Sequence, residues 1–387
     1  MASGKTILVL GGGIGGIVSA VRLRRLLSRE HRVVLVEKEA SHVFSPSFLW
    51  LMIGERGAAE ISRPLAALQR RGVELVHGVI ERIDPAERRI RVNGSDLTGD
   101  YMIIALGAEY APELVPGLAE AGHNFYTLAG AESLRATLPK LRSGRIVVLV
   151  ASMPFKCPAA PNEAAMLLDY DCRRRGVRKS IQIDLYTPEP GPMPVAGPEV
   201  SAALRGMIEA KGIGYHAGHT VTSVDPGKHR LAFANGTEAD FDLLAYVPPH
   251  RAAKVVQDAG LCGESGWVPV NRGTLETKFP NVCAIGDVTG IMLTSIGKPL
   301  PKAGVFANSQ AEVVAHNIAS AIASRGGPMR RFGGEGECFV ETGDGRAGFG
   351  SGNFYAEPAP QIKLRAPSML LHWGKVAHEK YWLWSRF

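Results

Sequence analysis

One cysteine of this chain lies in a strand-to-helix turn of the kind that usually binds a phosphate group. Cys157 follows a continuous apolar strand pattern at residues 146–150 and precedes a helical pattern at residues 162–174. In a dinucleotide-binding unit, the turn between such a strand and helix carries glycines that let the backbone approach a pyrophosphate. Residues 151–161 contain no glycine and place Lys156 and a thiol there instead. The helix N-terminus and the lysine both favour a thiolate, so the sequence predicts a thiol of lowered pKa.

The other cysteines follow no metal-binding pattern. No two cysteines show the C-x-x-C spacing, and the 11 histidines add no ligand spacing, so we expect no metal site. An odd number of cysteines without a secretory signal argues against a framework of structural disulfides. Three of them are expected to be small buried side chains, namely Cys172, Cys262 and Cys283.

A glycine motif near the N-terminus has the spacing of a dinucleotide-binding turn. Gly11, Gly13 and Gly16 follow a short apolar strand and open a helical pattern. The first glycine makes the tight turn, the second admits a pyrophosphate, and the third lets the helix pack closely on the sheet. Ile14 and Gly15 belong to the same turn, at a helix N-terminus that offers unpaired N–H groups to phosphates.

An acidic residue ends the second strand of this unit. Glu37 follows a strand pattern at residues 33–36, and its carboxylate can accept hydrogen bonds from both hydroxyls of an adenosine ribose. Lys38 follows it and is counted with the cofactor-binding residues. An acid at this point disfavours a 2′-phosphate, so we expect a dinucleotide other than NADP at this site.

Strand and helix patterns alternate along the rest of the chain, as in α/β proteins. Strands are predicted at residues 73–83, 88–92, 101–108, 181–186, 229–234, 243–247 and 281–289, and helices at residues 131–138, 200–211 and 309–323.

Three motifs together resemble the flavoproteins that have two dinucleotide-binding domains. They are the N-terminal glycine fingerprint, a small-residue turn containing Ala105 and Gly107, and a late Gly286-Asp287 pair. The resemblance implies an FAD cofactor, with Asp287 near its ribityl chain or pyrophosphate and Lys302 near the pyrimidine edge of the flavin.

The resemblance also implies an α/β fold with two Rossmann-like domains and a C-terminal amphipathic helical segment. We expect a discontinuous FAD domain at residues 1–110 and 270–330. A second domain at residues 111–269 is expected to carry Cys157 and, because it lacks a glycine fingerprint, not to bind NAD. Residues 331–387 are expected to hold the final helix.

Within these flavoproteins the chain is similar to sulfide:quinone oxidoreductase and to the flavoprotein subunit of flavocytochrome c sulfide dehydrogenase. The similarity is carried by KCPAAP at residues 156–161, by Cys338 in GECFVETGDGRAGFG, by residues 297–319, and by LLHWGKVAHEKYWLW in the tail. It implies that Cys157 and Cys338 form a redox pair, although they are far apart in sequence. Glu163 either moves protons, as the family's acid is suggested to do, or complements the helix dipole.

The resemblance implies a reaction in which sulfide becomes zero-valent sulfur or polysulfide. Hydrosulfide attacks a Cys157–Cys338 disulfide and leaves a persulfide and a thiolate. The electrons then pass through FAD to a membrane quinone. Assigning the persulfide to Cys338 and the place facing the flavin to Cys157 is a working hypothesis, and the reverse order stays open.

Two departures refine this family assignment. No cysteine lies in residues 41–54, where flavocytochrome c sulfide dehydrogenase tethers its flavin, so we expect non-covalent FAD. No cysteine precedes Cys157, so the chain resembles the members with two cysteines. We also expect no cleavable signal peptide, because five glycines follow the first apolar run within six positions.

The tail has the pattern of a helix that lies on a membrane. Apolar and aromatic residues recur at helical spacing and alternate with basic ones, and no apolar run reaches the roughly 18–20 residues of a membrane span. The apolar positions are Leu370, Trp373, Ala377, Tyr381 and Trp384, and the basic ones are Lys375, Lys380 and Arg386. We expect peripheral membrane association, with Phe354, Lys375 and Tyr381 near the quinone. The alternative is a helix docked on its own domain or on a second copy in a homo-oligomer.

The net charge of +7 alone identifies no partner, and nothing resembles a nucleic-acid module. Two functions remain as alternatives to a sulfide:quinone oxidoreductase. One is a sulfide dehydrogenase that donates electrons to a cytochrome c partner. The other is a non-catalytic, flavin-bound redox sensor.

Overall fold

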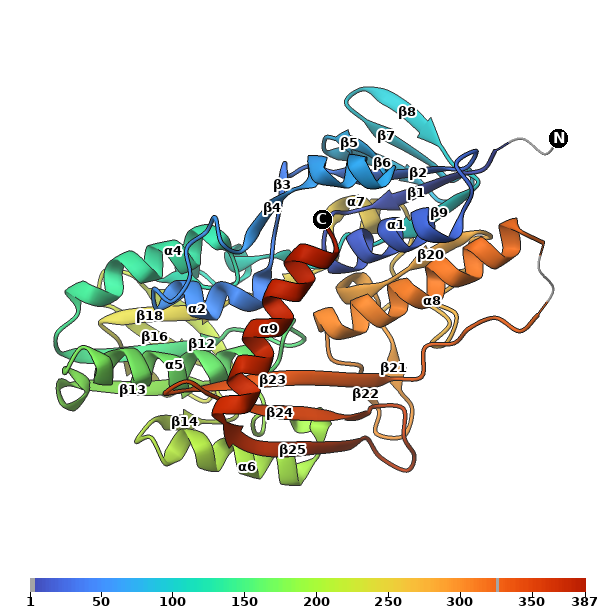
Figure 1. The fold of residues 1–387 in the computed structure, drawn as a ribbon. Helices are drawn as coiled ribbons and strands as arrows, with labels where there is room; N and C mark the ends of the chain where they lie inside the picture. Colours follow the sequence, from blue (N-terminus) through green and yellow to red (C-terminus); the bar gives the residue numbers. More distant parts are fainter. Residues whose placement is uncertain (1–3, 325–326) are drawn as a thin grey trace.

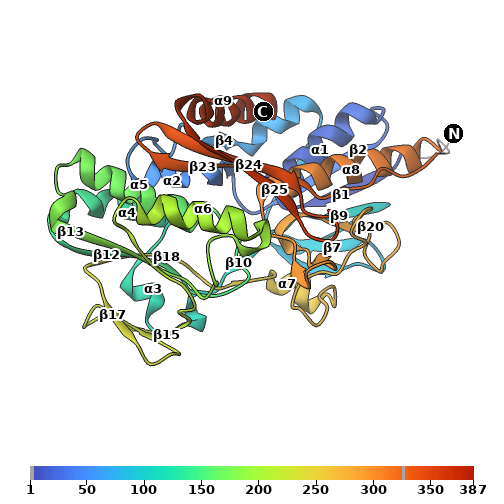
Figure 2. The same ribbon diagram turned by 90° about the horizontal axis from the view of Figure 1, so that it is seen from below.

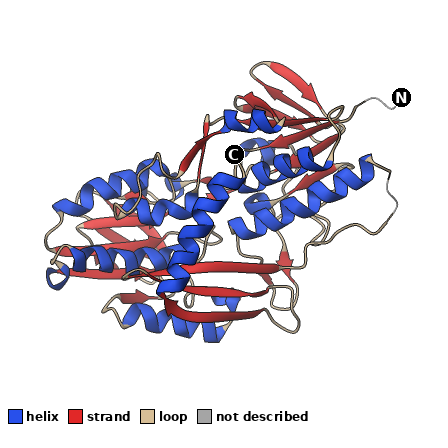
Figure 3. Cartoon of the chain, in the orientation of Figure 1, coloured by secondary structure: helices blue, strands red, loops and turns tan. Residues whose placement is uncertain are grey.

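The computed structural model describes residues 4–324 and 327–387. Two parallel five-stranded sheets form the frame of the molecule, and helix α9 runs between them (Figure 1). Helices pack against both sheets, and Figure 3 shows how helices and strands are distributed over the molecule. The predicted α/β class, with two Rossmann-like sheets and a final helix, is confirmed.

The first sheet contains the N-terminal strand. Its strands run in the order β20 (Val282–Ala284), β9 (Tyr101–Ile104), β1 (Thr6–Leu10), β2 (Arg32–Glu37) and β5 (Glu74–His77). Helices α1 (Ile14–Leu26) and α8 (Gly304–Ile322) pack against each other on it. The central strands are continuous apolar runs because both faces of the sheet are covered, so that successive side chains are all buried. Ile7 to Leu10 are fully buried.

The second sheet carries the turn with Cys157. Its strands run in the order β11 (His123–Asn124), β18 (Leu243–Val247), β12 (Gly144–Val150), β13 (Ile181–Tyr186) and β14 (Gly214–His216). Helix α5 (Ala160–Arg174) follows β12, with Pro161 in its first turn, where a missing N–H costs nothing. Helices α4 (Leu128–Thr137) and α6 (Pro198–Glu209) also belong to this domain.

An antiparallel sheet completes the molecule. Strands β23 (Glu335–Gly343), β24 (Arg346–Asn353) and β25 (Gln361–Ser368) follow one another along the chain. Helix α9 (Met369–Ser385) then lies across β23 and β24, and Figure 2 shows α6 on the other side of this sheet. The Ser368 side chain caps α9 by accepting a hydrogen bond from the Leu371 N–H at 3.3 Å.

Shorter elements join these layers. Small antiparallel sheets are formed by β6 (Ile80–Asp84), β7 (Arg89–Val92) and β8 (Ser95–Thr98), by β15 (Val221–Asp225), β16 (Arg230–Phe233) and β17 (Glu238–Asp240), by β3 (Ser41–Val43) and β4 (Ser62–Pro64), by β10 (Glu109–Tyr110) and β19 (His250–Arg251), and by β21 (Met292–Leu293) and β22 (Lys298–Pro299). The short helices are α2 (Phe48–Met52), α3 (Leu118–Ala121) and α7 (Lys254–Asp258). The single strand predicted at residues 73–83 is therefore two strands, β5 and β6, in different sheets.

Candidate functional site

One large cavity lies where the two parallel sheets, the antiparallel sheet and α9 meet. Its volume is about 1610 Å³. The walls combine the N-terminal glycine turn, the ends of β2 and β9, the turn after β12, strand β23 and the inner side of α9. Most of the residues predicted to bind a cofactor or react line it, namely Gly11, Gly13, Ile14, Gly15, Glu37, Lys38, Ala105, Gly107, Cys157, Glu163, Gly286, Asp287, Cys338, Lys375 and Tyr381.

The glycine turn has the geometry that its sequence predicts. Gly11 has φ +104°, which few side chains tolerate. A Cβ on Gly16 would lie 1.8 Å from the carbonyl oxygen of Gly11, so only glycine lets α1 pack this closely. A Cβ on Gly13 would meet nothing within 4 Å, so the cavity is open at the point where a pyrophosphate approaches. No side chain caps α1, which leaves its first N–H groups free for phosphate.

Glu37 is held in place by backbone donors. Its carboxylate accepts hydrogen bonds from the N–H groups of Gly12, Lys38 and Glu39, at 2.5, 2.8 and 3.0 Å. At the other end of the cavity, Asp287 is half-buried, and its buried Oδ1 atom has no hydrogen-bond partner within the described residues. A polar cofactor with ribose and ribityl hydroxyls satisfies both carboxylates, so these residues fit FAD.

Three predicted residues do not reach the cavity wall, namely Lys302, Phe354 and Gly16, which packs against the backbone of Gly11. Lys302 lies behind the wall, where its Nζ donates to the carbonyl oxygens of Asp287 and Thr289 at 2.7 and 3.0 Å, and burial lowers its pKa to about 8. Phe354 is buried against Phe306, with 5.2 Å between the ring centroids. Its packing in the core does not support a place beside the quinone.

Cys157 stands on a turn fixed by hydrogen bonds. Its backbone has φ +53°, and its N–H donates to the carbonyl oxygen of Lys302 at 2.7 Å. Its own carbonyl oxygen accepts from the Tyr126 hydroxyl at 3.1 Å and from the Ala160 N–H at 2.9 Å. Cys338 comes from β23, opposite Gly350 of β24, and both cysteines are free thiols. The fold therefore brings both sulfurs to one cavity.

The pKa predicted for Cys157 from the sequence is wrong in direction. Burial, with a smaller contribution from Glu163, raises the pKa of Cys157 to about 12. The ammonium of Lys156 lies over the ring of Tyr110, 4.5 Å from its centroid. The pKa of Cys338 is also raised, first by burial and then by the charges of Cys157 and Glu163. Desolvation outweighs the helix N-terminus at this site.

A buried ion pair lies beside the thiols. Lys375 of α9 donates to Glu163 of α5 at 2.9 Å, and the backbone N–H of Glu341 donates to the same oxygen at 2.8 Å. Burial lowers the pKa of Lys375, but Glu163 and Glu341 outweigh it and leave the pKa above its usual value. The positive charge of Lys375 in turn lowers the pKa of Cys157. Lys375, expected near the quinone, thus lies in contact with the sulfur side of the cavity.

Three residues of this region were missed from the sequence. His42 of β3 lies with Nδ1 3.0 Å from the carbonyl oxygen of Gly12, and its ring lies 4.8 Å from that of Trp382. Glu341 of β23 and His372 of α9 meet between these two elements, with 3.0 Å between Oε2 and Nδ1. The spacing of His372, Lys375 and Glu379 along one helix face is the signal that could have shown a polar inner side of α9.

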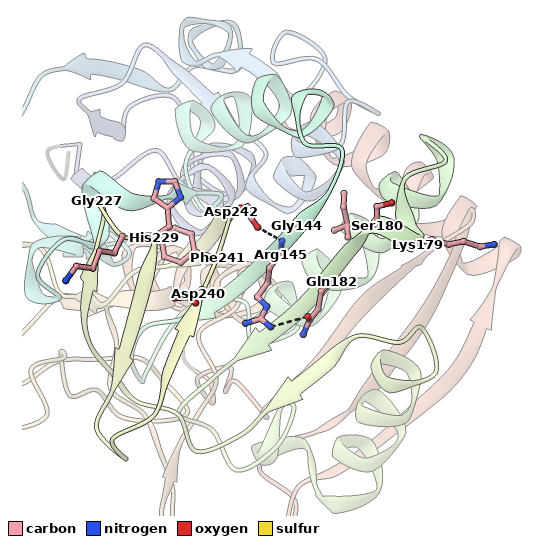
Figure 4. A pocket seen from close by; sticks show the side chains of 12 residues that line it. Gly144, Arg145, Lys179, Ser180, Gln182, Gly227, His229, Asp240, Phe241 and Asp242 are labelled. Atoms are coloured by element: carbon pink, nitrogen blue, oxygen red, sulfur yellow. Dashed lines mark hydrogen bonds between the residues drawn. The ribbon is translucent and has the colours of Figure 1, made fainter.

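A second groove, of about 810 Å³, lies apart from this site. It is formed at the amino-terminal ends of β12 and β13 and by the turn before β16 (Figure 4). Arg145 crosses it, with its N–H donating to Asp242 at 2.7 Å and its guanidinium to Gln182 at 3.1 Å. None of the residues predicted to react or to bind a cofactor lines it. Within residues 4–324 and 327–387, no three or more His, Cys, Asp or Glu side chains are grouped so that they could hold a metal ion.

Sequence comparison decides the family. A model for the pyridine nucleotide-disulphide oxidoreductases matches residues 5–311. The chain belongs to this family. It is therefore a flavoprotein oxidoreductase, and the predicted FAD cofactor is confirmed.

Several members of this family are similar over almost the whole chain. The sulfide-quinone reductase of Aquifex aeolicus (strain VF5) is 29% identical, over 98% of this chain and 91% of that protein. The mitochondrial sulfide:quinone oxidoreductase of Mus musculus is 27% identical, over 91% of this chain and 79% of that protein. The crystal structure of the Aquifex aeolicus sulfide:quinone oxidoreductase superposes with a TM-score of 0.89 at 26% identity, covering 99% of this chain and 91% of that one. The predicted resemblance to these enzymes is confirmed.

The name of a further relative specifies NADH, not sulfide, as the electron donor. The type II NADH:quinone oxidoreductase of Staphylococcus saprophyticus is 20% identical, over 85% of this chain and 85% of that protein. The glycine-free turn after β12 distinguishes the present chain from a protein that binds a second dinucleotide there.

Proposed function

We propose that the protein oxidises sulfide to zero-valent sulfur and transfers the two electrons through FAD to a quinone. The observation that carries this proposal is the single cavity lined by the glycine turn and by both Cys157 and Cys338. The relatives named for sulfide and quinone support it. The absence of glycine in the turn after β12 favours sulfide over NADH as the electron donor.

The sulfur step follows from the chemistry of a cysteine pair. A Cys157–Cys338 disulfide is attacked by hydrosulfide, so that a new S–S bond forms to one cysteine and the original S–S bond breaks. A persulfide is left on one cysteine, for which we favour Cys338, and a thiolate on the other. Bound FAD supplies a two-electron carrier between this thiolate and the quinone. Reoxidation of the pair releases the sulfur atom at zero valence to a sulfur acceptor.

The ion pair of Glu163 and Lys375 prepares the thiols for this step. Both thiols are half-buried, and desolvation raises their pKa values, so a thiolate forms there only with a positive charge nearby. Lys375 provides that charge and is held toward the cavity by Glu163 at 2.9 Å. Glu163 can accept or return a proton as the thiols change their ionisation.

We place the quinone in the part of the cavity next to α9. Tyr381, Trp382 and His378 line this part, together with Phe339 of β23. Aromatic side chains at the wall suit a planar, apolar ring.

We further propose that α9 attaches the protein to a membrane. Its outer side carries exposed apolar residues: Leu370 is 81% exposed, Trp373 61%, Tyr381 62% and Trp384 74%. Its inner side holds the buried Lys375, Glu379, Trp382 and Leu383. Tryptophan and tyrosine with nearby lysine suit the headgroup region of a bilayer. A second copy of the chain is the alternative occupant of this face.

No helix in the described part of the chain is long and apolar enough to cross a bilayer. A helix lying in the membrane plane requires no such length. A quinone dissolved in the lipid can then reach the cavity without crossing water.

Anaerobic reduction of the FAD-loaded protein tests the proposal. We expect sulfide to bleach the flavin absorbance and a short-chain quinone to restore it. NADH and cytochrome c, offered in separate samples as donor and acceptor, distinguish the alternatives. Bleaching by NADH but not by sulfide would overturn the proposal, and reoxidation by cytochrome c alone would favour a sulfide dehydrogenase.

A further inference from the structure

A set of buried polar groups leads from the cavity to the protein surface beneath α9, with one of its contacts made through a backbone N–H. Glu163, on the cavity wall, accepts hydrogen bonds from Lys375 at 2.9 Å and from the backbone N–H of Glu341 at 2.8 Å. The Glu341 carboxylate lies 3.0 Å from Nδ1 of His372. The side chain of Glu341 is 1% exposed and that of His372 is 16% exposed. The set therefore begins at the cavity and ends at a histidine that meets solvent.

The proposed reaction needs such a connection, because it consumes one proton from solvent in each turnover. Hydrosulfide releases two electrons and one proton when its sulfur reaches zero valence. A quinone takes up two electrons and two protons when it becomes a quinol. One proton is therefore missing from the balance, and it has to enter a cavity whose reacting thiols are only half exposed.

We propose that His372 takes up this proton from solvent and passes it through Glu341 to the Glu163–Lys375 pair. The inference rests on the proposed function, which creates the demand for the proton. Histidine is the side chain whose ordinary pKa suits proton transfer between pH 5 and 8. Each handover joins groups in hydrogen-bond contact, except between Glu341 and the ion pair, where the contact to Glu163 is through the Glu341 N–H.

Glu341 is suited to an intermediate position. Burial raises its pKa, while Lys375 and His372 act in the opposite direction and keep the carboxylate from holding its proton permanently. The charge of Glu341 also contributes to the raised pKa of Lys375, so the carboxylate acts on the ion pair although their side chains do not touch. A proton on Glu341 therefore changes the charge balance that Lys375 and Glu163 present to the cavity.

The charges around His372 come from several elements. Glu341 of β23 is the nearest, 3.0 Å from Nδ1, and Glu163 of α5 lies beyond it. Lys375 lies about one helical turn along α9. Arg56 lies over the far side of the Trp50 indole, which His372 meets edge-on with 5.9 Å between ring centroids. The Glu341 carboxylate is therefore the group in direct contact with the histidine to which a proton can pass.

The variant His372→Gln tests the route, because glutamine keeps a hydrogen bond to Glu341 but does not titrate. In the FAD-loaded protein we expect sulfide to bleach the flavin at the unmodified rate when no quinone is present. Quinol formation above pH 7 should fall by about tenfold, and added imidazole should restore it. A pH indicator in weakly buffered medium should show proton uptake slowed to the same extent. Glu341→Gln should give the same pattern without rescue by imidazole.

The control is His229→Asn, at an exposed histidine with φ +52°, a backbone conformation that asparagine accepts. It should change neither bleaching nor quinol formation. An unchanged pH profile in His372→Gln would overturn the route, and so would a parallel loss of bleaching and turnover. If the unmodified protein is not bleached by sulfide, the proposed function fails, and the route fails with it because nothing then draws the proton.

Discussion

At the scale of single residues, burial controls the chemistry of the two thiols. Cys157 precedes a helix and follows a lysine, yet its pKa is raised to about 12 because the surrounding protein excludes water. The nearby charges then decide how readily it ionises. Lys375 lowers the pKa of Cys157, whereas Glu163 raises it.

These two charges predict opposite effects of neutral substitutions. Lys375→Met should raise the pKa of Cys157 and slow its alkylation by iodoacetamide at neutral pH by about tenfold, since the thiolate is the reactive form. Glu163→Gln should lower the pKa and speed alkylation. The rate is measured against pH in the reduced protein, with Lys380→Met as a control at an exposed lysine of the same helix. Shifts of the same sign in both variants would contradict this account.

The same pair also predicts a stability effect. Lys375→Met leaves the buried carboxylate of Glu163 without its cation and should lower the free energy of unfolding by about 3 kcal/mol. The double variant Glu163→Gln/Lys375→Met should lose less than the two single variants together, because neither charge remains unpaired. Urea unfolding at pH 7 measures all three. Simple additivity would mean that the two side chains act independently.

At the scale of elements, α9 has its polar residues inside and much of its apolar surface outside. His372, Lys375 and Glu379 face the protein, and Glu379 accepts hydrogen bonds from Ser47 and Arg56. This arrangement suits a helix whose outer side meets lipid rather than water. Removing the whole tail would also remove the buried ion pair, so point substitutions on the outer side are the cleaner test.

Replacing the outer tryptophans is predicted to release the protein from membranes. Trp373→Ser/Trp384→Ser should weaken binding to phospholipid vesicles by at least about tenfold, because each indole contributes buried apolar area in the bilayer. Co-sedimentation with vesicles measures binding. Bleaching of the flavin by sulfide should be unchanged, since neither indole is buried in the site. Unaltered sedimentation of the variant would indicate that α9 is a structural helix or a contact between copies.

His42 lies between the glycine turn and α9, and its burial is predicted to make the stability of the protein depend on pH. Burial lowers its pKa to about 4, below the value near 6.5 of an unfolded histidine. The unfolded state therefore binds the proton more tightly, so this contribution to stability is complete above pH 6.5 and is lost as the pH falls toward 4. The loss reaches about 3 kcal/mol at the lower limit.

The substitution His42→Gln should flatten this pH dependence. We expect the difference in unfolding free energy between pH 7 and pH 4.5 to shrink, although the variant is less stable at pH 7. Urea unfolding of the FAD-loaded protein at the two pH values measures it, and His229→Asn should retain the full difference. His250, whose pKa burial lowers to about 3, acts in the same direction and is common to all the samples. An undiminished difference in His42→Gln would contradict this account.

At the scale of the whole molecule, the sequence predicted the features that depend on local patterns. The roles of Gly11, Gly13 and Gly16 follow from spacing alone, and the apolar runs predicted the longer strands of both parallel sheets. The short edge strands β11 and β14 were missed, because two or three residues form no recognisable pattern. The antiparallel sheet of β23 to β25 was missed, because glycines and charged residues conceal the strand pattern in residues 335–368. The domain boundaries at residues 110, 269 and 330 stay predictions.

The parts of the site that depend on long-range packing were not predicted. Glu163 and Lys375 lie far apart in sequence and meet only when α9 crosses the sheet. The raised pKa of Cys157 depends on burial, which the residues around it in the chain do not reveal. The two cysteines were matched through their local contexts, and the fold supplies the cavity in which they meet.

Anaerobic titration of cysteine variants with sulfide tests the central claim most directly, namely that electrons reach FAD through the Cys157–Cys338 pair. FAD-loaded Cys157→Ser and Cys338→Ser are compared with the unmodified protein and with Cys262→Ser, whose cysteine lies outside the cavity. We predict that the first two retain FAD but lose flavin bleaching by sulfide, while Cys262→Ser bleaches at the unmodified rate. Bleaching of Cys157→Ser at the unmodified rate would contradict the account.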